Sequence, residues 1–433
     1  MEFPHKLLQQ FAAGEFDSAF ALLYKLSAAK ECRARYSNLV DAFSKRYGEK
    51  PVAIISAPGR TEIGGNHTDH QHGRILAAAV DVDVLAAAAA NGGNEMRITS
   101  HGYPEFTVNA DDLSVKESER GESAALVRGI AAWFKEHGHR VQGFDAFAVS
   151  TVLSGSGLSS SAAFEIAVGN IINVLGGSGA SAVDIAIAGQ YAESKYFGKP
   201  CGLMDQTTSS VGGCVMIDFA EPINPIIKRV PVDLAADGLL LCTVDTKGSH
   251  VDLTPDYASI PYEMRMIARE LGHEYLREVD PSDFYGKIAM LRKTCGDRPV
   301  LRAMHFFEED SLVPRQAKAL EESRIEDFKR MVVSSGLSSF TKLQNIYSTT
   351  DVNQQGLSIA LAASEEILSG KGAWRVHGGG FAGTILALVP EELKSEYEEK
   401  LNAIFGEGSC HFLTIRPAGG IEVKPGIHAD AGI

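Results

Sequence analysis

The spacing of hydrophobic positions changes along the chain, and each change predicts a different secondary-structure element. Residues 1 to about 48 carry apolar positions at helical spacing among mixed charges, which predicts helices. The β-branched run that follows predicts a strand ending in a turn at Pro58 and Gly59. Later runs that are apolar or alternating predict strands, and runs with a period near 3.6 predict helices. The strands are expected at 74–89, 96–101, 106–110 and 144–153, and the helices at 122–137, 162–175 and 181–197.

The second half of the chain continues with strands and helices in irregular alternation. The segment 222–237 contains three prolines and predicts a domain junction. Beyond it we expect strands at 239–246, within 374–390 and at 410–415, several helices across 257–370, and a helix at 391–404. This order lacks a regular βαβ rhythm, which favours a mixed α/β or α+β fold over a doubly wound sheet.

Composition narrows the class of protein. The chain has 433 residues, of which 45% are hydrophobic and 22% charged, so we expect packed domains. Its net charge of −14 argues against a nucleic-acid partner, because phosphate attraction needs a basic surface. The longest apolar run is interrupted by Asp81 and Asp83, so we expect no membrane span. The start of the chain lacks a secretory signal, which predicts a soluble, cytoplasmic protein that acts on small molecules.

Cysteine usage adds two exclusions. The six cysteines are scattered and form no C-x-x-C pair, which argues against a thiolate metal site and against a disulfide framework. The sequence does not determine the oligomeric state, for which a monomer is the simplest expectation.

Two glycine-rich stretches have different sequence contexts. Residues 378–383 match G-x-G-x-x-G, but a strand-like run follows them, so we expect a tight β-connection and no dinucleotide site. Residues 153–163, Leu-Ser-Gly-Ser-Gly-Leu-Ser-Ser-Ser-Ala-Ala, lie between a predicted strand and a predicted buried helix. Their glycines and the helix start predict a phosphate site, although an N-capped core helix is the alternative. No Gly-Lys-Ser/Thr follows, so this is not a Walker A loop.

Acidic residues and histidines supply further candidates. Asp205 follows a turn-prone Pro-Cys-Gly and is either a helix cap or a base held in a cleft, while Glu193 lies twelve residues upstream. Three histidines and one aspartate gather in His67-Thr-Asp-His-Gln-His72. Such a cluster can bind a metal, contact a polar ligand or form an exposed loop.

Four segments in order give the chain a resemblance to the GHMP kinases (galactokinase, homoserine kinase, mevalonate kinase and phosphomevalonate kinase), and especially to the galactokinase branch. The branch signature Gly-Arg-Val-Asn-Leu-Ile-Gly-Glu-His-Thr-Asp-Tyr aligns without a gap with Gly-Arg-Thr-Glu-Ile-Gly-Gly-Asn-His-Thr-Asp-His at residues 59–70. The family's Gly-Leu-Ser-Ser-Ser-Ala is intact at 157–162. Its Cys-Gly-Ile-Met-Asp-Gln and Gly-Gly-Gly-Phe-Gly-Gly match 201–206 and 378–383.

The resemblance implies a fold and a reaction. The fold is a two-domain α+β architecture, with one domain like the second domain of ribosomal protein S5 and one of ferredoxin-like type. We therefore expect a helical extension at 1–48, an N-terminal kinase domain at 49–230 and a C-terminal kinase domain at 231–433. The implied reaction is ATP-dependent phosphorylation of galactose at its C1 hydroxyl, with Mg²⁺ accompanying ATP.

The resemblance also implies site residues. Asp205 matches the family's catalytic aspartate and Arg60 the arginine beside the reacting hydroxyl. The implied sugar contacts are Arg60, Asn66, His67, Asp69, Gly202, Asp205 and Tyr257, the last placed by its spacing of seven residues from His250. The implied ATP contacts are Gly155, Gly157, Leu158, Ser159, Ser160, Ser161 and Ala162, and the implied Mg²⁺ ligands are Ser161 and Glu193.

Departures from the signature concern the sugar. Asn66 stands where the family has a glutamate that faces the C6 side of galactose, and His70 replaces its closing tyrosine. The segments 247–250 and 341–351 also differ from the family's pattern. Galacturonate, which carries a carboxylate at C6, is therefore an alternative substrate. A non-catalytic sugar sensor is a third reading, but the intact phosphate loop and Asp205 favour an enzyme.

Overall fold

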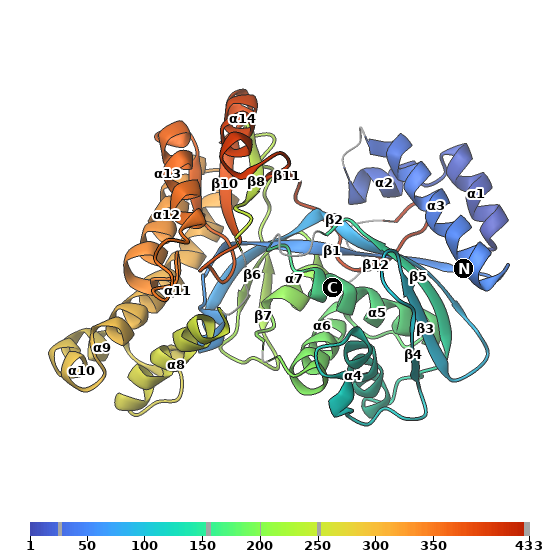
Figure 1. Ribbon diagram of the computed structural model, residues 1–433, viewed down its shortest axis with the longest axis horizontal. Coiled ribbons are helices and arrows are strands. Elements are labelled where there is room, and N and C mark those ends of the chain that lie inside the picture. The colour runs from blue at the N-terminus through green and yellow to red at the C-terminus, as the bar shows by residue number, and fades with distance from the viewer. Residues whose placement is uncertain (25–27, 153–156, 200, 249–252, 428–433) are drawn as a thin grey trace.

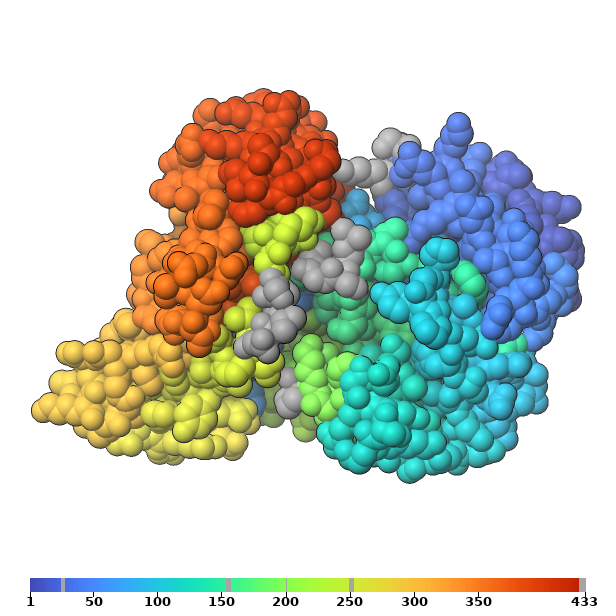
Figure 2. All heavy atoms as spheres, in the orientation of Figure 1, coloured from blue at the N-terminus to red at the C-terminus, as the bar shows by residue number. Residues whose placement is uncertain are grey.

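The computed structural model describes residues 1–24, 28–152, 157–199, 201–248 and 253–427. Its strands form one eight-stranded and one four-stranded sheet, each covered by its own helices (Figure 1). We call the large sheet with its helices the N-terminal half and the small sheet with its helices the C-terminal half. The two halves lie side by side and in contact (Figure 2). The mixed α/β architecture predicted from the irregular order of elements is confirmed.

The large sheet has the order β12-β1-β2-β5-β3-β4, and β6 pairs with β2 and with β7. The strand β1 does not end in a turn at Pro58 and Gly59 as predicted. It continues with a shift in register between Pro58 and Arg60, so the proline and glycine form a bulge inside the strand. The strands are β1 (Ala53–Gly64), β2 (Arg74–Ala90), β3 (Glu95–Ser100), β4 (Phe106–Asn109), β5 (Phe144–Ser150), β6 (Cys214–Asp218), β7 (Ile226–Arg229) and β12 (Ile421–Glu422).

Both faces of the large sheet are covered by helices. On β2, Ala86 and Ala88 face the core shared with α4, α5 and α6, whereas Leu85 and Ala87 face the N-terminal helices α1, α2 and α3. A strand buried on both faces reads as a continuous apolar run, which explains the sequence at 74–89. The helices are α1 (Pro4–Ala13), α2 (Asp17–Leu23), α3 (Ala29–Tyr47), α4 (Ser123–Glu136), α5 (Ser160–Gly176), α6 (Ala182–Tyr191) and α7 (Met204–Val211), with the π-helical segment η4 (Ala192–Phe197) after α6.

The small sheet has the order β11-β8-β10-β9, all antiparallel. Ile385 and Ala387 of β10 pack with α13 and α14, and Leu386 and Leu388 point to the opposite face, where α12 lies. The strands are β8 (Leu239–Asp245), β9 (Ala373–Val376), β10 (Thr384–Pro390) and β11 (Cys410–Leu413). The helices are α8 (Thr254–Glu270), α9 (Pro281–Gly286), α10 (Ile288–Thr294), α11 (Asp297–Glu321), α12 (Ile325–Ser338), α13 (Gly356–Leu368) and α14 (Lys394–Phe405), with the π-helical segment η6 (Ser339–Leu343) after α12.

The chain passes from the large sheet to the small sheet between β7 and β8 and later returns. The return strand β12 pairs with β1 through Ile55–Glu422 and Ser56–Ile421. Ile421 and Glu422, which fall within the predicted segment 231–433, therefore belong to the large sheet. Within the described residues, no helix is long and apolar enough to cross a membrane.

Candidate active site

Arg60 of β1 and Asp205 in the first turn of α7 form a two-pronged ion pair. Arg60 Nε donates to Asp205 Oδ1 and Arg60 Nη2 donates to Oδ2, both at 2.6 Å. Arg60 is only 7% exposed, whereas the Asp205 side chain is 28% exposed. The pair is thus anchored on the arginine side and accessible on the carboxylate side. It brings together the two residues predicted as catalytic.

The surroundings of Asp205 keep its carboxyl ionised. Burial alone would raise its pKa, but the Arg60 charge and hydrogen bonds from Arg60 and Ser159 outweigh burial and hold the pKa of Asp205 below its usual value. Ser159 Oγ donates to Oδ2 at 2.6 Å. A carboxylate has about four lone-pair sites, and these three bonds leave a free site on Oδ1. Asp205 can therefore accept one further hydrogen bond from a substrate hydroxyl.

The predicted phosphate loop is joined to this pair by backbone contacts. Arg60 Nη1 donates to the Gly157 carbonyl at 2.5 Å, and the Arg60 amide donates to the Leu158 carbonyl at 3.0 Å. Gly157 has a φ of 74°, and a Cβ there would lie 2.4 Å from Thr384 Oγ1. A side chain at position 157 is therefore excluded both by conformation and by space. Gly155, also predicted to contact ATP, lies outside the described residues.

The loop leads directly into α5, whose first turn can receive an anion. Ser159 occupies the N-cap position in the left-handed conformation with φ 57°, and its side chain makes no capping hydrogen bond. Ser160 and Ser161 follow in the first turn and are half-buried, while Ala162 is buried. Backbone N–H groups in a first helical turn lack intrahelical partners and lie at the positive end of the helix dipole. The predicted strand–loop–helix context of a phosphate site is therefore present.

His67 lies at the tip of the segment after β1 and has one unused ring nitrogen. Its Nε2 is 3.0 Å from the Gly379 carbonyl, so Nε2 carries the proton and donates. Burial lowers the pKa of His67 to about 3, which keeps the ring neutral. The remaining nitrogen, Nδ1, is buried and has no hydrogen-bond partner among the described residues. A ligand hydroxyl could supply that partner.

Asp69 and Gly202 meet at close range. A Cβ at position 202 would lie 2.1 Å from Asp69 Oδ2, so only glycine leaves room for the carboxylate. The Asp69 carboxylate accepts the His70 amide at 3.0 Å through Oδ1. The structure thus brings these two predicted sugar contacts together, from segments 133 positions apart in the sequence.

Tyr257 of α8 approaches the same region from the C-terminal half. Its hydroxyl donates to the Gly380 carbonyl at 2.8 Å, and its ring occupies the space that a Cβ at Gly379 would need. The stretch 378–383 connects β9 to β10, which confirms the predicted tight β-connection. This glycine stretch contacts both Tyr257 and His67.

Asn66 is placed differently from the other predicted sugar ligands. It is fully buried, with 0% exposure. Its Nδ2 donates to Glu62 Oε1 at 2.9 Å and to the Gly378 carbonyl at 2.7 Å, and its Oδ1 accepts from Asn345 at 2.9 Å. Both N–H groups are therefore already used within the protein. The sequence-based assignment of Asn66 as a sugar ligand is not supported by these surroundings.

Glu193 lies in the π-helical segment η4, next to two residues that the sequence reasoning missed. Gln206 Nε2 donates to Glu193 Oε2 and to Glu165 Oε2, each at 2.9 Å. Glu165 and Glu193 are buried, and Glu165 Oε1 has no hydrogen-bond partner among the described residues. Burial and the Glu193 charge raise the pKa of Glu165 well above its usual value. Only the position of Gln206 directly after Asp205 could have indicated this arrangement.

A carboxylate such as Glu193 is the kind of oxygen ligand that a hard divalent cation takes, but in this structure both of its oxygens already accept hydrogen bonds, Oε1 from Lys199 at 3.1 Å and Oε2 from Gln206 at 2.9 Å. Mg²⁺ takes oxygen ligands and is commonly held by one or two carboxylates together with phosphate oxygens. In the described part of the chain, no group of three or more histidine, cysteine, aspartate or glutamate side chains could hold a metal ion by itself. Any Mg²⁺ at Glu193 would therefore need ligands from the nucleotide, as is usual in kinases.

Of the remaining histidines in the 67–72 cluster, His70 lies beside His67, with ring centroids 5.7 Å apart, whereas His72 packs elsewhere. The His72 ring stacks on Tyr275 with centroids 3.7 Å apart, and His70 is half-buried beside Asp69. A histidine that sequence reasoning missed, His377, lies between the halves. Its Nε2 accepts the Glu62 amide at 3.2 Å, and its Nδ1 is 3.0 Å from Thr384 Oγ1.

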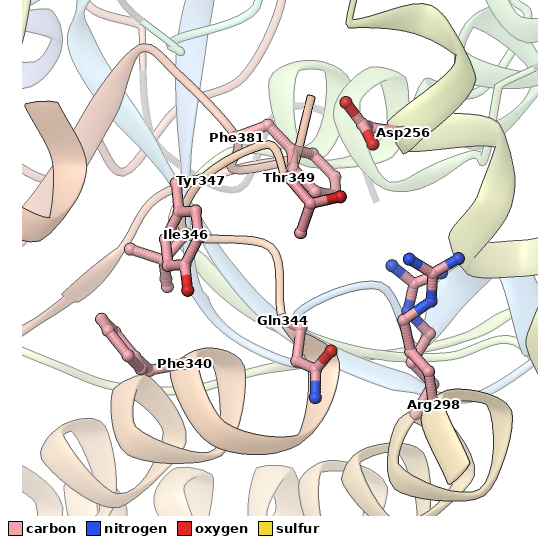
Figure 3. Close-up of a pocket in the computed structure, with 9 residues that line it drawn as sticks. Asp256, Arg298, Phe340, Gln344, Ile346, Tyr347, Thr349 and Phe381 are labelled. Atoms are coloured by element: carbon pink, nitrogen blue, oxygen red, sulfur yellow. The ribbon is translucent and has the colours of Figure 1, made fainter. Parts of the chain in front are cut away.

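A separate cavity of about 250 Å³ lies in the C-terminal half (Figure 3). It adjoins the glycine stretch through Phe381, whose ring packs edge-on against Tyr257 at 5.4 Å. None of the predicted catalytic or ATP-contacting residues lines it. The lining residues are Asp256, Arg298, Arg302, Phe340, Gln344, Ile346, Tyr347, Thr349 and Phe381.

Comparisons with known proteins agree with the fold. The galactokinase galactose-binding signature matches residues 41–90, and the GHMP kinases N terminal domain matches 125–213. A crystal structure of Lactococcus lactis galactokinase complexed with galactose has a TM-score of 0.78 and 20% identity, over 90% of this chain and all of that chain. A mevalonate kinase structure has a TM-score of 0.58 and 16% identity, over 83% and 99%. The chain is a GHMP kinase, a phosphotransferase that uses ATP.

Sequence relatives narrow the class further. The galactokinase of Glaesserella parasuis serovar 5 (strain SH0165) is 30% identical over 368 residues, which are 83% of this chain and 91% of the relative. The galactokinase of Streptomyces coelicolor (strain ATCC BAA-471 / A3(2) / M145) is 28% identical over 356 residues, 81% and 87% of the two chains. The chain belongs to the galactokinase family.

Proposed function

We propose that this sugar kinase transfers the γ-phosphoryl group of ATP to the anomeric C1 hydroxyl of galactose, giving galactose 1-phosphate, ADP and a proton. The observation that carries the proposal is the position of Arg60, which binds Asp205 through one edge of its guanidinium and the Gly157 carbonyl through Nη1. One side chain thus fixes the distance between the residue that receives the hydroxyl and the loop that holds the phosphates. Phosphoryl transfer depends mainly on such positioning and on charge neutralisation.

In this mechanism Asp205 accepts the proton of the C1 hydroxyl through its free site on Oδ1, and the hydroxyl oxygen forms the new bond to phosphorus. Arg60 stabilises the negative charge that develops on that oxygen. Ser159, Ser160 and Ser161 bind ATP phosphates with the first-turn amides of α5. Ser161 and Glu193 would hold the accompanying Mg²⁺, which would supply positive charge to the phosphates.

The sugar lies on the turn after β1 in this proposal. His67 Nδ1 accepts a hydrogen bond from one sugar hydroxyl. Asp69 accepts one or two further hydrogen bonds, because a carboxylate can pair with adjacent hydroxyls. Gly202 leaves room for that carboxylate, and Tyr257 closes the site from α8.

A panel of sugars tests the proposal with ATP and a coupled assay of ADP release. We expect galactose to give the highest kcat/KM in the panel. A large preference for galacturonate would contradict the choice of galactose, and ADP release that no sugar stimulates would contradict the kinase mechanism.

A further inference from the structure

Glu62 and Asn66 carry the two residue types of the galactokinase signature in exchanged positions. The signature has asparagine four residues before glutamate, whereas this chain has Glu62 four residues before Asn66. The two side chains touch, with Asn66 Nδ2 donating to Glu62 Oε1 at 2.9 Å. In this chain the carboxyl group is therefore at position 62 and the amide at position 66, and a hydrogen bond joins them.

The amide at position 66 is fitted to its neighbours. It donates to Glu62 and to the Gly378 carbonyl, and its oxygen accepts from Asn345 at 2.9 Å and from Ser339 at 3.3 Å. A carboxylate at position 66 has no proton to donate when ionised and would face the Gly378 carbonyl oxygen. The local structure thus requires an amide at this position.

The Glu62 carboxylate pairs with a buried arginine. Arg375 of β9 donates through Nη2 to Glu62 Oε1 at 2.9 Å and through Nη1 to the Ile63 carbonyl at 2.8 Å. Arg375 is fully buried and Glu62 nearly so. The carboxylate therefore neutralises an interior arginine and does not extend toward the ligand side of the turn.

The C-terminal half, which contains Arg375, also binds the backbone of the turn after β1. Glu309 of α11 accepts the Gly65 amide at 3.0 Å, and His305 Nε2 lies 2.9 Å from the Asn66 carbonyl. Together with Asn66 and Glu62, these contacts fasten the turn that carries His67 and Asp69 to the glycine stretch and to α11. The position of the predicted sugar contacts therefore depends on this buried cluster.

We propose that Asn66 is a positioning residue that, together with Glu62, holds the turn carrying His67 and Asp69 (the sugar turn) against the glycine stretch 378–383. We call this set of contacts the clamp. The C6 side of the sugar consequently has no charged partner at position 66. This inference rests on the proposed sugar C1-kinase function and names its substrate class. The acceptor is a galactose-configured hexose whose C6 substituent need not donate a hydrogen bond, so galactose and 6-deoxygalactose are both substrates.

Steady-state kinetics with D-galactose and 6-deoxy-D-galactose test the proposal. We expect the wild-type kcat/KM values for the two sugars to agree within about threefold, because a hydrogen bond to a charged group is worth a larger factor, roughly tenfold or more. We expect Asn66→Ala to lower both values while leaving their ratio unchanged. A wild-type preference above tenfold, or a ratio that collapses in Asn66→Ala, would show that Asn66 contacts the sugar.

Thermal unfolding tests the clamp independently of any sugar. Asn66→Ala and Glu62→Ala should each lower Tm by about 2 °C or more, and the loss in the double variant should be clearly smaller than the sum. The matched control is the exposed pair Asn94 and Asp111, also an amide–carboxylate contact, at 2.6 Å. Asn94→Ala should shift Tm by less than about 1 °C. Equal Tm shifts at the Glu62–Asn66 pair and at the control pair would contradict the clamp. If no sugar reacts, only the proposed kinase function and the substrate class that rests on it are contradicted.

Discussion

The Arg60 guanidinium and the Asp205 carboxylate meet edge to edge, with both N–O distances at 2.6 Å. This geometry fixes the orientation of the carboxylate as well as its charge, because a planar fork pairs with two oxygens in one plane. The ligand-facing site on Oδ1 is therefore held in a defined direction by a side chain that is itself buried.

Removing the carboxylate tests its role as base. Asp205→Asn keeps the shape of the side chain but cannot accept the proton as readily, so we expect kcat to fall by about 10²-fold to 10⁴-fold. Circular dichroism and Tm should show a folded protein. Asp283→Asn, at an exposed position on α9, serves as the control and should retain full turnover. Wild-type turnover in Asp205→Asn would exclude the assigned role.

Removing the arginine charge should shift the pH dependence of activity. Because the Arg60 charge and hydrogen bonds lower the pKa of Asp205 against the effect of burial, Arg60→Met should raise that pKa. The carboxylate then becomes ionised only at higher pH. We expect the acidic limb of the kcat/KM profile to move up by about one unit or more, together with a lower maximum. If the acidic limb lies at the same pH in both proteins, Arg60 does not control the ionisation of Asp205.

Gly202→Ala tests the contact with Asp69. The new Cβ would lie 2.1 Å from Asp69 Oδ2 and must displace that carboxylate. We expect the KM for sugar to rise about tenfold or more while the KM for ATP stays within about twofold, since one misplaced hydrogen-bonding group costs roughly 1–3 kcal/mol. Gly286→Ala is a matched control, because nothing lies within 4 Å of a Cβ at that exposed site. An unchanged KM for sugar in Gly202→Ala would show that Asp69 does not bind the sugar.

Glu193→Gln tests the proposed cation site. The amide keeps the shape of the side chain but loses the charge that attracts Mg²⁺, so the Mg²⁺ concentration needed for half-maximal activity should rise about tenfold to 100-fold. The KM for sugar should change little. Titration of the folded protein with Mn²⁺ in the presence of ATP, followed by electron paramagnetic resonance, gives a readout that does not depend on turnover. Equal Mn²⁺ affinity in both proteins would rule out Glu193 as a ligand.

His377 makes stability depend on pH. Burial lowers its pKa to about 3, below the value of about 6.5 in the unfolded chain, so the unfolded state binds the proton first as pH falls. The stabilisation linked to the neutral ring is present above pH 6.5 and is lost progressively below it, by up to about 1.4 kcal/mol per pH unit.

Urea unfolding of wild type and His377→Gln at pH 7 and pH 5 isolates this effect. We expect the wild-type protein to lose about 2 kcal/mol more than the variant between the two pH values. Other groups cancel in this difference, including Glu62, whose pKa is raised to about 7 by burial and which acts in the opposite direction. A gap between the two proteins that stays constant with pH would contradict the role of His377.

The sequence predicted the phosphate loop and Asp205 because their signals are local. A glycine-serine loop before an apolar helix requires no knowledge of distant residues, and α5 begins at Ser160, two residues before the predicted start at 162. The burial of Asn66 could not be found in this way. Its environment comes from Gly378 and from Asn345, about 280 to 310 positions further along the chain.

The apolar strand β2 gives a second example of this limit. Asp83 interrupts its hydrophobic run with a charged residue. In the structure Asp83 is fully buried and accepts from Arg35 Nη2 at 2.6 Å and from Tyr24 at 2.5 Å. The pattern of one segment cannot show that an N-terminal helix brings a cation to a strand about 48 positions away.

The ion pair between Glu62 and Arg375 has a consequence for how ligands come and go. The two charges belong to different sheets, and both are buried where the halves meet. Separating the halves would break this buried pair and leave Glu62 without Arg375, although Arg375 would keep Glu309 of its own half at 3.7 Å. Breaking a buried pair typically costs about 3–5 kcal/mol. Substrates and products should therefore exchange by local movement of surface segments near the site, while the two halves stay joined throughout the catalytic cycle.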